Sequence, residues 1–273
     1  MNRSSELRAF LRSRRARLNP AELGVPTYGE RRRVPGLRRE ELARLAGLGV
    51  DYYVRLEQGR NEKISAEALD AVARALRLTS VERLHLHRLA RPVRRPMRAC
   101  SAQAAPGLQR LLDAMPAVPA YVVGRRTEVL AWNDPARLIF GDVLALTPQR
   151  RYMARQVFLN PGARSLFRDW DMKARDVTAR LRLGFGRCPD DEELLSLVDE
   201  LSAASSDFRR IWEAHHLMDK SHGSYRFSHD RLGLFTLAYR ALRVPEEPDQ
   251  LLITYTWGPG STLATALRKG HGW

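Results

Sequence analysis

The chain has 273 residues, 44% of them hydrophobic and 28% charged, which excludes wholesale disorder and favours two globular domains over one. It contains no apolar run long enough for a membrane span and no charged-then-apolar leader, and its two cysteines, Cys100 and Cys188, form neither a disulfide framework nor a metal-ligand spacing. These absences predict a soluble cytoplasmic protein without a bound metal. The net charge of +15 is uneven, because residues 1–98 hold 23 Lys and Arg against 11 Asp and Glu, whereas residues 99–273 hold 23 against 20.

Residues 1–91 are expected to form an all-α domain of five short helices that contains a helix-turn-helix. A first amphipathic helix spans about residues 4–18, with apolar residues on one face and arginines on the other. Residues 19–37 follow as a loop with three prolines, three glycines and three consecutive arginines.

Residues 39–59 carry the most informative pattern, two short helices joined by a tight turn at Gly47. Ala43 is small where the second helix must cross the first closely, and Gly47 accepts the positive φ that the turn needs. The apolar residues that hold the pair together are Leu42, Leu48, Tyr53 and Leu56. This is the layout of a helix-turn-helix, whose second helix presents its outer face to a DNA groove.

Two capping patterns complete the domain. Ser65 is the expected N-cap of a fourth helix, and Thr79 with Glu82 forms a capping box for a fifth helix. The prolines and arginines that follow predict a solvated linker over residues 92–105.

Residues 106–273 follow a different pattern and are expected to form an α+β domain. The expected helices cover residues 106–115, 135–140, 163–183, 190–204 and 208–219. The expected strands cover residues 120–123, 128–132, 225–227, 232–243 and 250–257. Strands first, helices in the middle and strands last predict an antiparallel sheet with helices packed on one face.

The residues expected to contact DNA gather around the second helix of the helix-turn-helix. Its exposed face comprises Gly49, Val50, Asp51, Tyr52, Val54 and Arg55, and Arg55 could donate two hydrogen bonds to guanine. Contacts to phosphates or a narrow minor groove are expected from Arg31, Arg32, Arg33, Arg38, Arg39 and Arg60. Glu57 is expected to turn away from DNA and to pair with an arginine of the first helix. A solvated charge is the alternative role for any single arginine, but the set predicts DNA binding.

The sequence resembles the MmyB-like family of transcription regulators. The likeness is carried by residues 37–43, 50–60, 119–123, 129–133, 208–212, 248–251 and 259–261. It implies an N-terminal helix-turn-helix of the phage-repressor type and a C-terminal PAS-like sensory domain that binds a small apolar ligand such as a fatty acid. The chain departs from the family pattern at Gly49, where a serine is usual, and at Trp257, where a shorter polar or acidic residue is common.

The pocket of a PAS-like domain is lined by aromatic and aliphatic side chains. The candidate ligand-binding residues are Trp132, Phe140, Trp170, Trp212, His215, Tyr239, Tyr255 and Trp257. Aromatic residues at strand and helix spacing also pack as ordinary core, so core packing is the alternative role for each of them.

His215 and Asp219 support a competing prediction. At i and i+4 on a helix, they could bind a metal or form an acid–base pair. His222 and His229 do not have a spacing that would make either of them a third metal ligand, so no metal site is assigned. The sequence shows no catalytic motif elsewhere, so no enzyme activity is assigned.

The sequence therefore predicts a sequence-specific transcription regulator that binds double-stranded DNA as a homodimer and senses a small apolar ligand, with no membrane partner. A dimer is expected because one helix reads only a few base pairs, and two linked modules gain effective concentration. Two alternatives stay open. The C-terminal domain could be a ligand-free dimerisation or protein-interaction module, or the chain could be an enzyme with a DNA-binding head.

Overall fold

The computed structural model describes residues 2–25, 36–60, 64–91, 103–141, 146–147 and 151–258. The chain divides into two compact units. The first unit comprises residues 1–97, 185–196 and 213–217, and the second comprises residues 98–184, 197–212 and 218–273. The predicted phosphate contacts Arg31, Arg32 and Arg33 and most of the predicted linker lie outside the described residues. Within the described ranges, no helix is long and apolar enough to cross a membrane.

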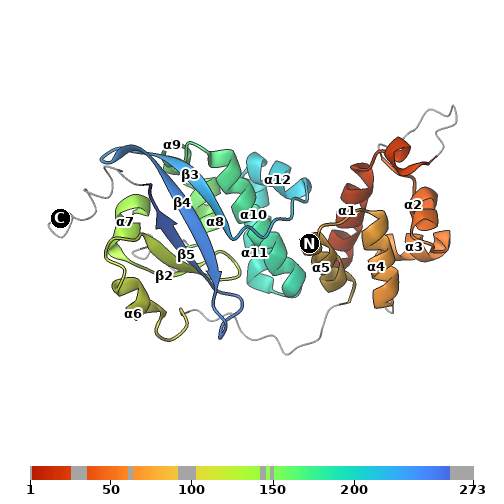
Figure 1. The fold of residues 1–273 in the computed structure, drawn as a ribbon, viewed down its shortest axis with the longest axis horizontal. Coiled ribbons are helices and arrows are strands. Elements are labelled where there is room, and N and C mark those ends of the chain that lie inside the picture. The colour runs from red at the N-terminus through yellow and green to blue at the C-terminus, as the bar shows by residue number, and fades with distance from the viewer. Residues whose placement is uncertain are drawn as a thin grey trace. The chain divides into compact units, whose positions relative to one another are not determined.

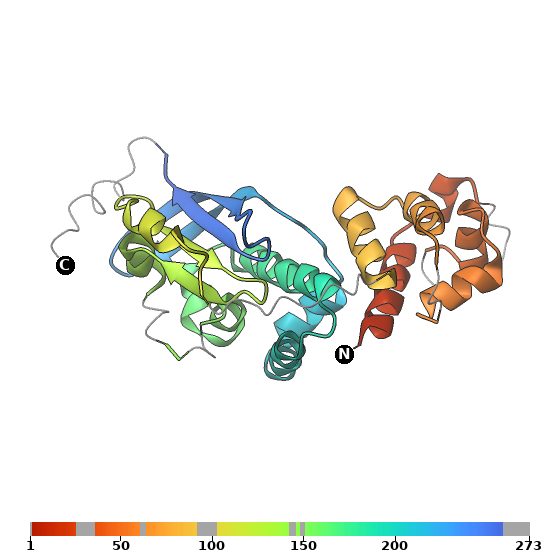
Figure 2. The same cartoon turned by 90° about the horizontal axis from the view of Figure 1, so that it is seen from below.

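The N-terminal part of the first unit is helical (Figure 1). Its described elements are α1 (Arg3–Ala16), the 3-10 helix η1 (Pro20–Leu23), α2 (Arg39–Leu45), α3 (Val50–Glu57), α4 (Ala66–Ala75) and α5 (Ser80–Ala90). Figure 2 shows these helices, coloured red to yellow, gathered around a common core. Phe10, Leu42, Tyr53, Leu69 and Leu86 lie in that core with 0% of their surface exposed. The five predicted helices are thus confirmed, and η1 occupies part of the segment expected to be a loop.

The helices begin where the sequence supplies capping residues. Ser65 Oγ accepts a hydrogen bond from Ala68 N at 3.1 Å at the start of α4. At the start of α5, Glu82 N donates to Thr79 Oγ1 at 3.3 Å and Thr79 N donates to Glu82 Oε2 at 2.9 Å, which is the predicted capping box. The turn between α2 and α3 passes through Gly47 at a φ of +66°, as expected for a helix-turn-helix.

The C-terminal half of the chain combines helices with a five-stranded antiparallel sheet. The described helices are α6 (Leu108–Asp113), α7 (Asp134–Phe140), α8 (Met153–Leu159), α9 (Gly162–Leu166), α10 (Trp170–Arg187), α11 (Glu192–Ala204) and α12 (Ser206–Glu213). The strands are β1 (Ala120–Val123), β2 (Val129–Trp132), β3 (His222–His229), β4 (Gly233–Arg243) and β5 (Leu251–Thr256). Their order in the sheet is β2-β1-β5-β4-β3, so β5 joins the first hairpin of the chain to the last.

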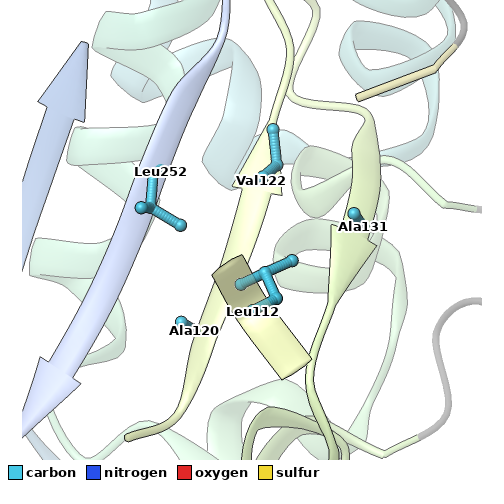
Figure 3. Close-up of a cluster of buried hydrophobic side chains, with 5 residues drawn as sticks. All are labelled: Leu112, Ala120, Val122, Ala131 and Leu252. Carbon is cyan, nitrogen blue, oxygen red and sulfur yellow. The ribbon is translucent and has the colours of Figure 1, made fainter. Parts of the chain in front are cut away.

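One face of the sheet is covered by α6. Successive side chains of a strand point to opposite faces, so Ala120 and Val122 face one way and Tyr121 the other. Leu112 of α6 is fully buried and packs on the first of these faces. Figure 3 shows this cluster, which contains Leu112, Ala120, Val122, Ala131 and Leu252.

Helices α7 and α10 lie on the opposite face of the sheet. The ring of Phe140 from α7 meets the ring of Tyr121 edge-on with centroids 5.8 Å apart, and Asp176 of α10 accepts a hydrogen bond from Tyr225. Helices therefore cover both faces of the sheet. The expectation that they would pack on one face only was wrong, because the short helix α6 also carries a buried leucine.

The helices differ most from the predicted ones at two places. The helix expected over residues 163–183 is divided into α9 and α10, because Phe167 leaves the helix and forms an isolated β-bridge with Phe227. The helix expected over residues 208–219 ends at Glu213, and His215 beyond it has a φ of +49°. Helix α8 was not predicted.

Candidate DNA-binding surface and ligand-domain core

The predicted DNA-contacting residues of α3 lie on its outer face. Arg55 and Asp51 are exposed, Val50 is 40% exposed, and Tyr52 and Val54 are half-buried. The opposite face, with Tyr53, Leu56 and Glu57, is buried, as the helical period requires. Among the described residues, none makes a hydrogen bond or ion pair with the guanidinium of Arg55. Its donors therefore remain available to an external acceptor.

Glu57 is withdrawn from this surface and holds three helices together. Its side chain is 1% exposed and accepts from Arg15 of α1, with Nε 3.2 Å from Oε2 and Nη2 3.3 Å from Oε1. Arg39 of α2 donates through Nε to Oε1 at 2.8 Å, and the Tyr53 hydroxyl donates to Oε2 at 2.8 Å. The predicted pairing of Glu57 with an arginine of the first helix of the helix-turn-helix is thus confirmed, and α1 joins it.

The electrostatics of this Glu57 network favour its charged form. Burial by itself would raise the pKa of Glu57, but the hydrogen bonds donated by Arg15, Arg39 and Tyr53 outweigh burial, so the pKa lies below its ordinary value. The hydrogen bond and charge of Glu57 in turn raise the pKa of Arg39. Burial, together with the nearby Glu57 carboxylate, raises the pKa of Tyr53 well above its usual range. The network is therefore charged at neutral pH, and it fixes how α3 is held against α1 and α2.

The other predicted phosphate contacts lie at the ends of these helices. Arg39 is 47% exposed and shares its guanidinium between Glu57 and solvent, and Arg38 directly before it is half-buried. Arg60 is exposed just after α3, and its backbone N–H donates to the carbonyl of Arg55 at 2.9 Å. Gly49 is the N-cap of α3 and makes no side-chain capping bond. These positions agree with the expected surface, and their contacts with DNA stay predictions.

In the second unit, eight aromatic rings of the described residues form a continuous cluster on the sheet face that α7 and α10 cover. This ring cluster consists of Tyr121, Phe140, Phe167, Tyr225, Phe227, Phe235, Tyr239 and Tyr255. Phe140 lies near its centre, with ring centroids 5.4 Å from Tyr255, 6.0 Å from Phe227 and 6.3 Å from Phe167. Phe140 and Phe235 remain half-buried, whereas Tyr255 and Phe227 are fully buried. The cluster is thus reached from outside at Phe140 and Phe235.

Four of the candidate ligand-binding residues lie in or beside the ring cluster. Phe140, Tyr239 and Tyr255 belong to it, and Trp132 stands opposite Tyr121 in the register of β1 and β2. Trp132 is 7% exposed, and its indole Nε1 has no hydrogen-bond partner among the described residues. A buried donor without a partner calls for an explanation, and a bound water or ligand is one such explanation.

The remaining candidates lie elsewhere. Trp170 and Trp212 belong to a separate group of rings with Phe158 and Phe208, and Trp170 Nε1 donates to the carbonyl of Val157 at 2.9 Å. Trp257 follows β5 and is half-buried. His215 lies in the first unit, where its Nδ1 is 3.3 Å from Glu6 Oε1. The structure therefore gathers half of the predicted ligand residues and leaves the other half outside the ring cluster.

A charged group borders the ring cluster. Asp176 accepts from the hydroxyls of Tyr225 at 2.6 Å and Tyr239 at 3.4 Å, and Lys220 Nζ lies 2.9 Å from its other oxygen. Burial and the Asp176 carboxylate raise the pKa of Tyr239 to about 12, so this hydroxyl stays a donor at neutral pH. Lys173, one turn before Asp176, is buried.

Sequence reasoning missed several members of this region. Tyr225 and Phe227 are two residues apart on a strand and therefore share a face, so alternation would have predicted them. Lys173 carried no such signal, because a single lysine on an amphipathic helix is most often solvated.

The pair proposed for metal or acid–base chemistry does not assemble. Because α12 ends at Glu213, His215 and Asp219 do not share a helix face, and Asp219 instead pairs with Arg243. No group of three or more metal-ligating side chains forms within the described ranges.

Comparison with known families agrees with this architecture. Residues 6–86 match a helix-turn-helix domain, and residues 104–269 match the MmyB-like transcription regulator ligand binding domain. No curated protein matches the chain. The families found are DNA-binding and ligand-binding domains rather than enzymes. With a helix-turn-helix followed by this ligand-binding domain over more than half of its length, the chain belongs to the MmyB-like family of DNA-binding transcription regulators.

Proposed function

We propose that this protein is a sequence-specific regulator that binds DNA as a homodimer, reads the major groove with α3, and responds to a small apolar, fatty-acid-like ligand in its C-terminal domain. The proposal places the DNA-binding domain at residues 1–91, the linker at 92–105 and the ligand domain at 106–273. The observation that carries it is the division of charge on α3. Arg55 is exposed and unpaired among the described residues, whereas Glu57 is buried in the network with Arg15.

This division suits a phosphate-rich partner. An exposed carboxylate at position 57 would repel DNA, but its burial leaves Asp51 as the acidic side chain on the outer face of α3. An arginine that projects from a recognition helix reads guanine through two parallel hydrogen bonds, each such pair being worth about 1–3 kcal/mol of discrimination. Arg38, Arg39 and Arg60 would set the register of the helix through phosphates, without reading sequence.

The DNA-binding proposal is tested with Arg55→Ala and a matched exposed arginine on α4, Arg74→Ala. We expect Arg55→Ala to reduce the preference for operator over random DNA by about 10-fold or more in a titration at fixed salt, since one bidentate base contact is lost. Arg74→Ala should leave that preference unchanged. If Arg55→Ala weakens operator and random DNA equally, Arg55 is a phosphate anchor and α3 does not read sequence through it.

The homodimer is proposed from geometry, because two-fold DNA-binding modules contact half-sites about 10 base pairs apart. Footprinting of the full chain on its operator should protect two such half-sites, and sedimentation should give twice the chain mass of 31.1 kDa. A single protected half-site with a monomeric mass would contradict the dimer.

The ligand part of the proposal rests on the ring cluster and on Trp132. Aromatic lining with a few polar groups is the usual composition of a small-molecule site. Native mass spectrometry of the purified full chain should detect a bound apolar molecule that Phe140→Ala weakens. Consistently empty protein that also binds no added fatty acid would favour the alternative, a C-terminal domain that serves dimerisation or protein contact alone.

A further inference from the structure

A short segment between α12 and β3 packs on α1 within the first unit. This docked segment, Glu213–Leu217, belongs to the first unit, whereas the rest of α12 and all of β3 belong to the second. Its backbone carbonyls accept hydrogen bonds from two arginines of α1 and its C-cap, since Arg17 Nη2 donates to Ala214 at 2.6 Å and Arg14 Nη2 donates to His215. Carbonyls at the end of a helix carry partial negative charge, so guanidinium groups suit them as donors.

The contacts around His215 are buried. Its Nδ1 lies 3.3 Å from Glu6 Oε1, and the two side chains are 8% and 2% exposed. Arg14 is 3% exposed and also pairs with Glu82 of α5, with 2.9 Å between Nε and Oε1. His215 has a φ of +49°, which residues with a side chain seldom adopt and which persists only where the surroundings hold it. Specific contacts with α1 therefore keep the segment in place.

The helix that receives the docked segment also holds the recognition helix. Arg15, next to Arg14 on α1, donates to Glu57 of α3 through Nε at 3.2 Å and Nη2 at 3.3 Å. Neighbouring residues of an α-helix point about 100° apart, so the two arginines engage different partners from one turn. A change in the position of this turn therefore acts on α3 as well as on the segment.

The other end of the docked segment leads to the ring cluster. Lys220, three residues after Leu217, has its Nζ 2.9 Å from Asp176 Oδ1. The other oxygen of Asp176 accepts the hydroxyls of two members of the ring cluster, Tyr225 at 2.6 Å and Tyr239 at 3.4 Å. A molecule that displaced either tyrosine would disturb the ion pair of Lys220, and with it the chain that runs back to Leu217.

We propose that the docked segment transmits the state of the ring cluster to the recognition helix. In the ligand-free chain, the pair of Lys220 with Asp176 keeps the segment docked, and α1 stays where Arg15 engages Glu57. A ligand that disturbs this pair releases the segment and weakens operator binding. Such coupling needs a contiguous set of contacts with two arrangements, here docked and released. The inference rests on the proposed ligand-responsive DNA binding and specifies how it is regulated.

The competing explanation is that the segment only packs beside α1 and transmits nothing. Removing the ammonium of Lys220 should then leave operator affinity unchanged, because Lys220 lies in the second unit and the DNA-binding helices in the first. Removing Arg17 should then have the same effect as removing any other exposed charge of α1.

The test is a double-mutant cycle in the full chain, with affinity for the footprinted operator at fixed salt as the readout. Arg17→Met removes the donor to Ala214, and Lys220→Met removes the ion pair with Asp176. Arg17 is exposed and Lys220 half-buried, so both variants should fold, which circular dichroism checks. The matched control is Arg12→Met, the same change at an exposed arginine of α1 that makes no hydrogen bond or ion pair within the described ranges.

We expect Lys220→Met and Arg17→Met each to weaken operator binding about fivefold or more, and Arg12→Met to weaken it much less. The double variant should bind no more weakly than the weaker of the two single variants, because either change alone releases the segment. Unchanged operator affinity in Lys220→Met overturns the proposal. Effects that add in the double variant, or equal effects of Arg17→Met and Arg12→Met, also overturn it.

Dodecanoate, used as a probe of the ring cluster, separates this inference from the proposed function. It should weaken operator binding by the unaltered chain and have little effect on Arg17→Met. A full effect of dodecanoate on Arg17→Met overturns the role of the docked segment while the ligand-sensing function stands. If dodecanoate leaves operator binding by the unaltered chain unchanged, it contradicts the ligand-sensing function, and the double-mutant cycle alone decides the role of the segment.

Discussion

Glu57→Gln is the substitution that most directly tests how the recognition helix is held. Glutamine keeps the length and shape of the side chain but removes the charge that Arg15 and Arg39 share. It also places an amide donor opposite groups that are themselves donors. The exposed face of α3 is unchanged by this substitution, so any effect on DNA binding acts through the position of the helix.

The expected loss of stability follows from how exposed the two arginine partners of Glu57 are. Arg15 has 9% of its side chain exposed, so without Glu57 it becomes a buried charge with no counter-ion, which costs about 3–5 kcal/mol. Arg39 is 47% exposed and remains solvated, so the loss of its ion pair with Glu57 costs about 1 kcal/mol or less. Because the glutamine oxygen still accepts one hydrogen bond, we expect a total loss of about 3 kcal/mol. That is a large fraction of the roughly 5–15 kcal/mol that stabilises a typical domain.

The distribution of tryptophan provides the assay. All five tryptophans lie in the second unit, so tryptophan fluorescence follows its unfolding while circular dichroism follows the helices of both units. In urea, Glu57→Gln should shift the helical signal of the first unit to lower denaturant and leave the fluorescence transition in place. Asp70→Asn is the control, since Asp70 pairs with Arg83 at the surface, where solvent screens the pair, and its loss should shift the helical transition much less. Equal shifts for the two variants would refute the reasoning that burial makes the Glu57 network strong.

The same network predicts a pH dependence with a definite sign. The folded-state pKa of Glu57 lies below its ordinary value of 4.5, so its contribution is fully present above that pH and is lost as the pH falls through the folded value. Acidification should therefore reduce the difference in unfolding free energy between the unaltered chain and Glu57→Gln. A difference that stays constant down to about pH 3 would contradict a charged Glu57.

Three further substitutions test local features by urea unfolding of the full chain. Gly47→Ala should destabilise the first unit by about 1–2 kcal/mol. The cause is the positive φ alone, since no atom lies within 4 Å of the added Cβ. Gly47→Asn should destabilise the unit less, because asparagine tolerates a positive φ better than alanine. Gly49→Ser should stabilise the same unit by a few tenths of a kcal/mol, roughly, because it supplies the side-chain cap that α3 lacks. Asn133→Ala should destabilise the second unit by about 2–3 kcal/mol, because this buried amide caps α7 and also bonds the backbone ahead of β1.

Local patterns were sufficient to predict most of the fold. The caps at Ser65 and Thr79 and the glycine at position 47 act within a few residues, so the sequence displays them directly. The break at Phe167 was not predictable in this way. It depends on a β-bridge to Phe227, sixty residues further along the chain, and no local signal marks such a partner.

The two candidate sites differ in how far sequence could predict them. The outer face of α3 follows from helical period alone, so the exposure of Arg55 and the burial of Glu57 were both expected. The ring cluster depends on the register of β1, β4 and β5, which brings Tyr121, Tyr239 and Tyr255 together from distant segments. A list of aromatic residues could name some of its members but could not separate them from Trp170 and Trp212, which pack between helices.

The buried charge of Glu57 fixes how the recognition helix is held. Around Glu57, each buried group has a partner of opposite charge or a hydrogen bond, and such a saturated network fixes one geometry, which a recognition helix needs before it meets DNA. A recognition helix held in this way has its outer face preformed before any partner arrives.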